Sequence, residues 1–317
     1  MRNQKVEFID IIEAGERIAP WINRTPVMTC STLDGMVGAE LYFKCENFQK
    51  AGAFKSRGAV NAVFSLSDKD ASRGVATHSS GNHAAALARA AAARGIPAYI
   101  VMPGTAPDIK KEAVYGYGGK ITFCEPTLQA REDELAKIVE TTGASFIHPY
   151  DDPRVIAGQG TAAVEFLEDV PDLDLLVTPV GGGGLLSGTA IAARHIRPEA
   201  EVYGGEPVGA DDAYRSFKKG ELIPSVSPDT IADGLLTSLS ERTFSIIREL
   251  VTDIVRVDDD SIRSAMMLVW ERMKIIIEPS AAVPLAAVMG RGLDVEGRKA
   301  GIFFSGGNVS LEIDGCS

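Results

Sequence analysis

The sequence of 317 residues lacks an apolar run long enough to span a bilayer, and its first residues, MRNQKVEFID, contain no apolar core of a secretion signal. It also lacks an excess of basic residues, because 32 Lys and Arg stand against 43 Asp and Glu and leave a net charge of −11. A nucleic acid or an anionic membrane is therefore not the expected partner. We expect a cytoplasmic protein that binds neither.

Cysteine and histidine are scarce, with four of each in the chain. The cysteines are far apart and show no CxxC or metal-ligand spacing: Cys30, Cys45, Cys124 and Cys316. We expect them to be reduced thiols. The four histidines, at positions 78, 83, 148 and 195, make a Ser-His-Asp hydrolase possible on composition, but the sequence has no GxSxG elbow for the nucleophile.

What is present is an alternation of short apolar, strand-like runs with helical patterns, beginning with a helix expected at 7–22. This alternation predicts an α/β fold with parallel sheets covered by helices on both faces. We expect two open parallel-sheet lobes with the active site in the cleft between them. The larger domain would comprise 1–73 and 149–317, and the smaller, inserted domain 74–148. A long acidic and polar loop is expected from 206 to about 230.

The stretch GAFKSRGA, residues 52–59, places Lys55 between an aromatic residue and glycines, shortly after the apolar run Leu41-Tyr42-Phe43. Burial would lower the pKa of this amine and make it nucleophilic, as a Schiff-base lysine requires. The alternative is an ordinary lysine whose amine reaches solvent from a helix start. The octapeptide alone favours that alternative.

A second stretch, GGGGLLSG at 181–188, changes the interpretation in favour of a Schiff-base lysine. It follows the apolar run Leu175–Val180 and opens a helix, so that several backbone N–H groups can converge on an anion. It is neither a Walker A loop nor a GxGxxG loop. The alternative is a flexible turn, but four consecutive glycines lose too much conformational entropy on folding to serve only as a turn. The stretch therefore predicts a phosphate site.

Two further junctions carry polar residues. SSGNH, residues 79–83, lies between a strand and a helix, where N–H groups and hydroxyls suit a substrate carboxylate. Helix capping by Ser79 or Ser80 is the alternative, and both can hold at once. FFSGGNV, residues 303–309, ends the last strand in a glycine turn and places Ser305 where a strand end could meet a cofactor ring.

These motifs, in this order, resemble those of the pyridoxal-phosphate (PLP) enzymes of the tryptophan-synthase-β fold. Within that group the chain is similar to the serine/threonine dehydratase and serine racemase family along almost its whole length. The segments IADGLLTSL, 231–239, and LVWERMKIIIEPSAAV, 268–283, belong to this similarity. The resemblance implies PLP as the cofactor and a homodimer as the assembly.

The resemblance also implies roles for individual residues. Lys55 would hold the cofactor covalently and act as a base at Cα, and Ser80 would be the second catalytic acid and base on the opposite face. The implied cofactor-binding residues are Phe54, Lys55, Asn82, Gly181, Gly182, Gly183, Gly184, Leu185, Gly234 and Ser305. The implied residues at the substrate carboxylate are Ser79, Ser80, Gly81 and His83. A serine at 305 would not keep the pyridine nitrogen protonated, which favours expulsion of a β-leaving group from the substrate.

The loop EPVGADDAYRS, 206–216, could supply the side chains of Glu206 and Asp212 and the carbonyl of Ala210 as hard oxygen ligands to Mg²⁺, Ca²⁺ or Mn²⁺. Acidic loop residues are usually only solvated. The spacing resembles the divalent-cation site of the racemase-like members of the family, which favours a structural or activating ion away from the chemistry.

The substrate would be a small β-hydroxy amino acid that loses water and then ammonia to give a 2-keto acid. Ala53 in the GAFK form of the lysine motif resembles hydroxyaspartate dehydratases. Arg154 and Arg215 are cations that a plain serine site does not require, and either could bind a distal carboxylate in a bidentate fork. For each arginine alone, a surface salt bridge with a neighbouring aspartate is the favoured alternative.

We therefore expect a 3-hydroxyaspartate dehydratase that forms oxaloacetate and ammonia. The alternatives that stay open are an L-serine/L-threonine dehydratase or a serine racemase, with racemisation also possible as a secondary activity. A PLP-dependent β-replacement synthase and a non-catalytic PLP-binding protein are more remote alternatives.

Overall fold

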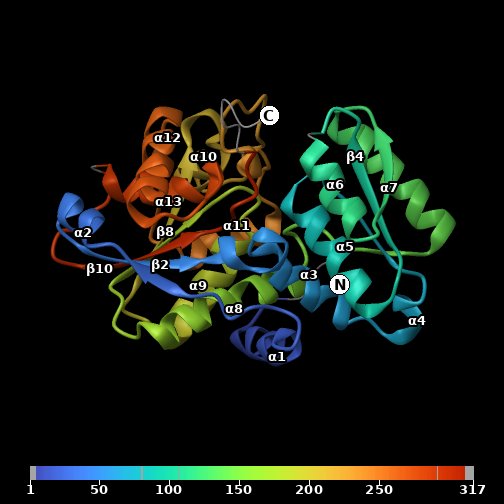
Figure 1. Cartoon of the computed structure of the whole chain (residues 1–317), viewed down its shortest axis with the longest axis horizontal. Helices are drawn as coiled ribbons and strands as arrows, with labels where there is room; N and C mark the ends of the chain where they lie inside the picture. The colour runs from blue at the N-terminus through green and yellow to red at the C-terminus, as the bar shows by residue number, and fades with distance from the viewer. Residues whose placement is uncertain (1–4, 80, 107, 291, 311–317) are drawn as a thin grey trace.

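The computed structural model describes residues 5–79, 81–106, 108–290 and 292–310. Its strands form two sheets, which lie in separate lobes (Figure 1). The six-stranded sheet has the order β1-β2-β10-β7-β8-β9, made of Val27–Thr29, Glu40–Cys45, Lys299–Phe304, Leu175–Pro179, Glu201–Pro207 and Asp253–Val257. The four-stranded sheet has the order β5-β4-β3-β6, made of Lys120–Cys124, Ala98–Pro103, Val75–His78 and Ser145–Phe146.

Every strand pair is parallel except β1 with β2 at one edge of the larger sheet. Parallel strands require crossover connections, and helices supply them. The helices are α1 Phe8–Ile18, α2 Ser31–Val37, α3 Lys55–Phe64, α4 Asp68–Ala71, α5 Asn82–Arg94, α6 Asp108–Gly116, α7 Leu128–Thr142, α8 Pro153–Asp169, α9 Gly184–Ile196, α10 Asp212–Lys219, α11 Glu241–Leu250, α12 Asp259–Leu268 and α13 Pro279–Met289. The predicted α/β fold with two parallel-sheet lobes is confirmed.

The larger sheet is buried on both faces, as a parallel sheet must be. One face packs against α2, α12 and α13, and the other against α1, α8, α9 and α11 (Figure 1). Strand β10 shows the alternation: Ile302 and Phe304 enter the first cluster, whereas Phe303 enters the second. Because all of these side chains are buried, the strand reads in sequence as one continuous apolar run.

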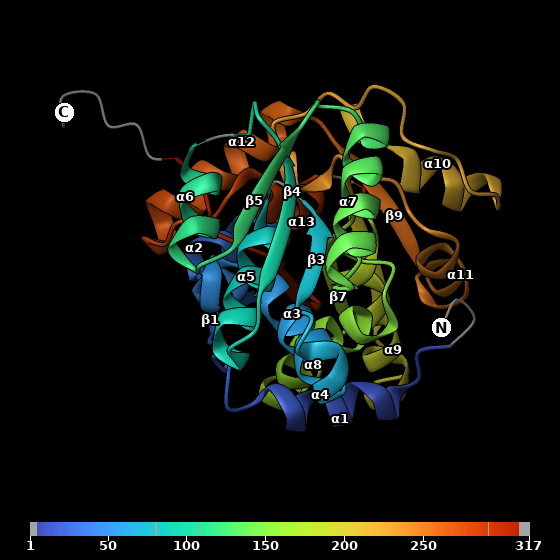
Figure 2. The same ribbon diagram turned by 90° about the vertical axis from the view of Figure 1, so that its right-hand side faces the viewer.

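The smaller sheet also lies between helices. Helices α3 and α5 cover one face together with α6, and α7 covers the other (Figure 2). Helix α5 is rich in alanine, which lets it approach α3 closely, and α3 in turn packs on α8 of the larger lobe. Helix α3 therefore belongs to the packing of both lobes.

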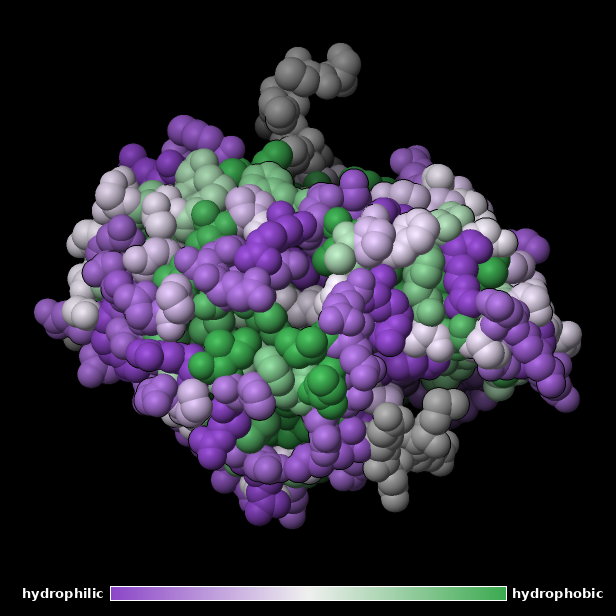
Figure 3. Space-filling model, turned by 90° about the horizontal axis from the view of Figure 1, so that it is seen from below, coloured by the Kyte–Doolittle hydropathy of each residue, from purple (hydrophilic) through white to green (hydrophobic). Residues whose placement is uncertain are grey.

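The surface seen from below the view of Figure 1 is mixed, with a group of hydrophobic residues near its centre and hydrophilic residues around it (Figure 3). Among the described residues, no helix is both long and apolar enough to cross a membrane. The cysteines that the structure describes, Cys30, Cys45 and Cys124, are free thiols.

Two segments differ from the sequence-based expectation. The helix expected at 7–22 ends at Ile18, two residues before Pro20. The polar segment from 206 to about 230 is not all loop, because α10 forms within it. Four of its eight residues are charged, which is why the segment was expected to be a loop, but Ala213, Tyr214 and Phe217 form an apolar face that packs against the core of the larger lobe.

Candidate active site

Lys55 is the first residue of α3. The backbone just before it is held in place by contacts with the segment that follows β10. The backbone N–H of Phe54 donates to the Ser305 carbonyl at 3.0 Å, and Ala53 forms an isolated bridge with Gly306. Gly52 has a φ of 70°, and a Cβ there would meet Asn308 Oδ1 at 2.3 Å. The glycine of the GAFK motif is therefore required by a left-handed turn and a close contact.

The Lys55 amine points into the protein. Its Nζ donates to the Pro149 carbonyl at 3.0 Å and lies 5.0 Å from the centre of the Phe54 ring. Desolvation lowers the pKa of Lys55 to about 8, against the opposing charge of Glu278, which raises it. A larger fraction of this amine is neutral and nucleophilic near pH 7 than for an ordinary surface lysine.

The tetraglycine segment joins β7 to the N-terminus of α9, and all four glycines are buried. Gly183 caps the helix with a φ of 83°. A Cβ on Gly182 would lie 2.2 Å from the Tyr150 ring, and one on Gly181 would lie 3.0 Å from the Leu235 Cα. The segment is therefore tightly packed and is not a flexible turn. The first N–H groups of a helix have no intrahelical acceptor, so this donor set suits an anion such as a phosphate.

Other predicted cofactor residues surround this segment. Leu185 follows the glycines in the first turn of α9 and is 3% exposed. Gly234 lies in η4, a 3₁₀ turn over Asp233–Leu235, and its N–H donates to Ser280 Oγ at 3.0 Å. Ser305 follows β10 directly and is buried. Strand ends and helix starts of the larger lobe thus bring these residues to one region, as expected for an open parallel sheet.

Asn82, at the start of α5, is held by two partners from the larger lobe. Its Nδ2 donates to Glu278 Oε1 at 2.8 Å, and its Oδ1 accepts from Asn308 Nδ2 at 2.9 Å. Glu278 was not among the sequence-predicted site residues. It is 5% exposed, and burial together with the charge of Asp233 raises its pKa to about 7. The only sequence signal for it is an acidic residue before Pro279 at a helix start.

The SSGNH motif lies between β3 and α5, as expected. Gly81 N–H donates to Ser79 Oγ at 3.3 Å, and Gly81 is the residue before α5. A Cβ on Gly81 would meet no described atom within 4 Å, so open space adjoins it. Ser80, the predicted second catalytic residue, lies outside the described residues.

Three histidines lie near this site as neutral imidazoles. Burial lowers the pKa of His78 and of His148 to about 4 and that of His83 well below its usual value, and the nearby Lys55 charge contributes at His83 and His148. His148 Nδ1 accepts from the backbone N–H groups of Tyr150 at 3.3 Å and Asp151 at 2.9 Å, so its proton is on Nε2. His83 Nε2 faces the Ile147 carbonyl at 3.4 Å, and its buried Nδ1 has no partner among the described residues.

Both arginines predicted for the distal carboxylate are ion-paired. Arg154 forms a bidentate pair with Asp152 at 2.9 and 2.6 Å. Arg215 pairs with Asp211 at 2.7 Å, and Asp211 also accepts from Arg256 at 2.8 Å. These contacts favour the alternative that was stated for each arginine, a salt bridge with a neighbouring aspartate.

The predicted cation ligands come from the end of β8 (Glu206), from the 3₁₀ turn η3 over Val208–Ala210 (Ala210) and from the first residue of α10 (Asp212). Glu206 and Asp212 are each 1% exposed, and burial raises the pKa of Glu206 to about 9 and that of Asp212 to about 6. Both carboxylate oxygens of Asp212 are buried without a hydrogen-bond partner among the described residues. Among the described residues, no group of three or more His, Cys, Asp or Glu side chains is placed to hold a metal ion, so a cation here would also need the Ala210 carbonyl and water.

Known proteins are similar to this chain over almost its whole length. The family model described as "Pyridoxal-phosphate dependent enzyme" matches residues 18–306. The β-hydroxyaspartate dehydratase of Paracoccus denitrificans (strain Pd 1222) is 51% identical over 305 residues, covering 96% of this chain and 97% of the relative. The serine racemase of Dictyostelium discoideum is also 51% identical, covering 96% of each chain.

Solved structures agree as well. The crystal structure of the Dictyostelium discoideum serine racemase has a TM-score of 0.93 and covers 96% of this chain and 99% of its own. The structure of a pyridoxal 5′-phosphate-dependent aspartate racemase has a TM-score of 0.92 at 38% identity, covering 98% of each chain. This chain belongs to the family of pyridoxal-phosphate dependent enzymes.

Proposed function

We propose that this protein is a PLP-dependent dehydratase, an ammonia-lyase, that converts 3-hydroxyaspartate to oxaloacetate and ammonia. The residues present fit the cofactor, because a half-buried amine with a lowered pKa bonds the Pro149 carbonyl, and the adjacent Tyr150 packs on the tetraglycine segment at a helix N-terminus that suits an anion. The observation that carries the substrate assignment is the position of Arg131 on α7. The alternatives are an L-serine/L-threonine dehydratase and a serine racemase.

Arg131 is a cation available to a ligand. Its side chain makes one long hydrogen bond, to the Thr127 carbonyl at 3.4 Å, and has no carboxylate partner within ion-pair distance among the described residues. Burial lowers the pKa of His78 to about 4, and the Arg131 charge adds to that shift. Burial raises the pKa of Tyr150 to about 12, and the Arg131 charge opposes that shift, so the guanidinium lies near both side chains. Tyr150 in turn packs on Gly182 of the tetraglycine segment. A guanidinium at this place could bind the distal carboxylate of a dicarboxylic substrate.

The chain's own residues support elimination as follows. When bound, PLP supplies an electron sink that stabilises negative charge at the substrate Cα. Lys55 removes the Cα proton and holds it on Nζ, where its lowered pKa suits proton transfer near neutral pH. Asn82, fixed by Glu278 and Asn308, orients the cofactor ring, and Ser79, Gly81 and His83 bind the α-carboxylate. Ser80 would be the acid and base on the opposite face.

We also propose a divalent cation, such as Mg²⁺, at Glu206, Asp212 and the Ala210 carbonyl. Two buried carboxylates with raised pKa values are destabilising without a counter-charge, and a cation would neutralise them. The role would be structural. Assembly as a cytoplasmic homodimer, and division into a large domain of 1–73 and 149–317 and a small domain of 74–148, complete the proposal.

The test is an assay of the protein loaded with PLP and Mg²⁺ against L-serine, D-serine, L-threonine and the stereoisomers of 3-hydroxyaspartate. We expect oxaloacetate from one hydroxyaspartate isomer at a much higher kcat/KM than pyruvate from L-serine. Arg131→Gln should lower kcat/KM for hydroxyaspartate on the order of 100-fold, because a bidentate contact to a charged group is lost, with little change for serine.

Arg154→Gln and Arg215→Gln are matched controls, because they make the same change at arginines that are ion-paired with aspartates. If either of these, and not Arg131→Gln, alters the hydroxyaspartate/serine ratio, the distal carboxylate binds there. Comparable turnover of serine or threonine would establish the dehydratase alternative, and D-serine formed from L-serine would establish the racemase.

A further inference from the structure

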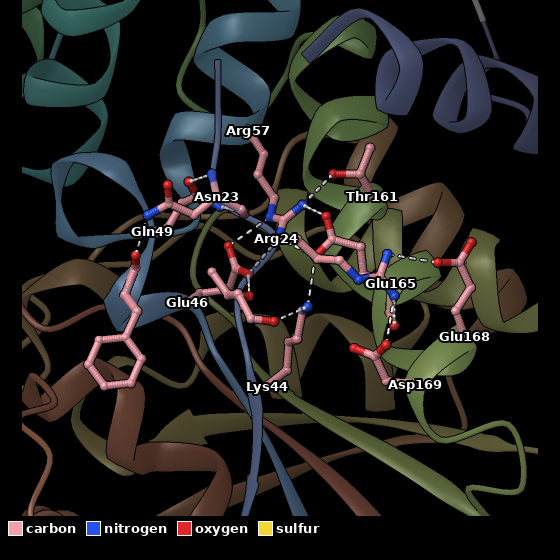
Figure 4. Close-up of polar contacts among 12 residues, drawn as sticks. Asn23, Arg24, Lys44, Glu46, Gln49, Arg57, Thr161, Glu165, Glu168 and Asp169 are labelled. Carbon is pink, nitrogen blue, oxygen red and sulfur yellow. Dashed lines mark hydrogen bonds and ion pairs between the residues drawn. The ribbon is translucent and has the colours of Figure 1, made fainter. Parts of the chain in front are cut away.

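A buried ionic cluster contacts α3, the helix that begins at Lys55, and the proposed chemistry does not use it (Figure 4). Arg57, two residues after Lys55, is fully buried. Its guanidinium bonds Glu46 through Nε and one terminal nitrogen, both at 2.8 Å, and Glu165 through both terminal nitrogens, at 2.8 and 2.7 Å. A fifth bond, at 3.0 Å, goes to Thr161 Oγ1. All five N–H donors of the arginine are therefore used.

The cluster is closed and balanced in charge. The Lys44 amine, also fully buried, donates to Glu165 Oε2 at 2.7 Å and to the Thr25 carbonyl at 2.8 Å. The Thr25 hydroxyl donates to Glu46 Oε1 at 2.5 Å. Two cations thus face two carboxylates. Burial alone would raise the pKa of Glu165, but Arg57 and Lys44 lower it, so the carboxylate stays ionised.

The cluster joins elements that are far apart in sequence. Lys44 is on β2, Glu46 is in η1, a 3₁₀ turn over Glu46–Phe48, Arg57 is on α3, and Glu165 is on α8. Backbone packing reinforces the junction, because a Cβ on Gly158 of α8 would lie 2.6 Å from the Gly58 Cα of α3. The first turn of α3 is therefore fixed against the larger lobe from two sides.

The segment before Lys55 is fixed as well. Gln49 Oε1 accepts from the backbone N–H groups of Asn23 and Lys50, both at 2.9 Å, and the Ser56 hydroxyl bonds the Lys50 carbonyl. A buried ion-pair cluster is not an efficient source of stability, since apolar side chains of similar size often serve as well. What a saturated, planar guanidinium supplies instead is a defined position.

We propose that Arg57 is a positioning residue, which fixes the first turn of α3 so that the Lys55 amine is held in the active site. The inference rests on the proposed function, in which Lys55 is the reactive amine. Among the described residues, the Lys55 amine contacts the Pro149 carbonyl and the Phe54 ring, and Arg57 does not touch it. It acts on catalysis only through the backbone of α3.

The test variant is Arg57→Lys, which keeps the charge and removes the planar fork. The matched control is Arg24→Lys. Arg24 pairs with Glu168 and Asp169 and donates to the Glu165 carbonyl at 3.5 Å, all on α8, but its side chain is exposed and bonds no residue of α3 among those described (Figure 4). Both proteins would be compared after circular dichroism has shown that they are folded.

The first readout needs neither PLP nor substrate. The cofactor-free protein is treated with acetic anhydride over a range of pH, and acetylation of Lys55 is followed by peptide mass spectrometry. We expect Arg57→Lys to move the midpoint for Lys55 from about 8 towards the usual lysine range, because a misplaced amine reaches water. Arg24→Lys should leave it unchanged.

The second readout is steady-state kinetics of the holoenzyme. A displacement of about 1 Å can cost on the order of 100-fold in rate, so kcat should fall on that order in Arg57→Lys with little change in KM. Folded Arg57→Lys protein with the wild-type Lys55 midpoint and wild-type kcat would overturn the proposal. An equal effect of Arg24→Lys would overturn it too. In that case any ion pair with a carboxylate of α8 would affect Lys55, and Arg57 would have no special role.

If Arg57→Lys does not fold, Glu46→Gln decides, since it disturbs one of the two forks. A wild-type Lys55 midpoint in that variant would refute the positioning role, and a midpoint shifted towards the usual lysine range would support it. A shifted midpoint in a protein that turns over no hydroxy amino acid would leave the positioning role standing and reject the proposed function.

Discussion

At the scale of single residues, the charge of Lys55 depends on Glu278. Desolvation lowers the pKa of Lys55 to about 8, and the Glu278 carboxylate opposes this shift. Glu278 also holds Asn82 through a 2.8 Å hydrogen bond. One buried carboxyl group is therefore linked both to the reactive amine and to the residue predicted at the cofactor ring.

The substitution Glu278→Gln tests this link. It removes the charge that raises the Lys55 pKa, so the Lys55 midpoint should fall below about 8. Acetylation of the cofactor-free protein at a series of pH values measures the midpoint, and Glu112→Gln, on an exposed position of α6, is the control. A midpoint that rises or stays constant would show that Glu278 does not act on the amine.

Residues whose role depends on the backbone could be predicted from sequence, whereas residues whose role depends on a distant partner could not. Gly182 and Lys55 stand in runs of unusual composition. Glu278, Tyr150 and Arg131 stand in ordinary segments, and each acquires its role from a partner brought by the fold, as Tyr150 does from Gly182. Arg154 and Arg215 show the reverse, since their neighbours in sequence are their ion-pair partners.

At the scale of elements, the site is assembled from the carboxyl ends of parallel strands and the helix starts that follow them. Strands β3 and β10 lead directly to Ser79 and Ser305, and β7 leads to Gly181 through Val180. This arrangement was predictable because each of these strands contains consecutive apolar residues and is followed within two residues by glycine or serine. Strand β9 was missed, because Arg256 interrupts its apolar alternation at the edge of the sheet.

The turn between β8 and α10 should depend on a cation. Without one, Glu206 and Asp212 have folded pKa values of about 9 and about 6, above those of the unfolded chain. The folded state then binds more protons than the unfolded state between about pH 4 and pH 9, so stability falls as pH rises through this window, by up to about 1.4 kcal/mol for each pH unit and group.

Removal of the ion with a chelator should therefore lower Tm more at pH 8 than at pH 5.5, and added Mg²⁺ should restore it. Differential scanning calorimetry at the two pH values measures this. Asp212→Asn is the comparison variant, in which the response to Mg²⁺ should be weaker. A chelator effect that is equal at both pH values would place the cation elsewhere.

At the scale of the whole molecule, polar contacts cross between the lobes beside the site. Asn82 of α5 reaches Glu278 at the start of α13, and Lys110 of α6 forms an ion pair with Asp233 of η4. Asp233 raises the pKa of Glu278, and Lys110 lowers it. The approach of the smaller lobe thus affects the charge of a buried group in the larger one.

Opposite substitutions in this pair should have opposite effects. Asp233→Asn removes the charge that raises the Glu278 pKa, so the pKa should fall below about 7, whereas Lys110→Met removes the charge that lowers it, so the pKa should rise. The pH dependence of kcat/KM reports this ionisation in the free enzyme. The pair is partly exposed, so each variant should lose no more than about 1 kcal/mol of stability. Shifts of both variants in the same direction would contradict this electrostatic account, because an anion and a cation near one carboxyl group change its pKa in opposite directions.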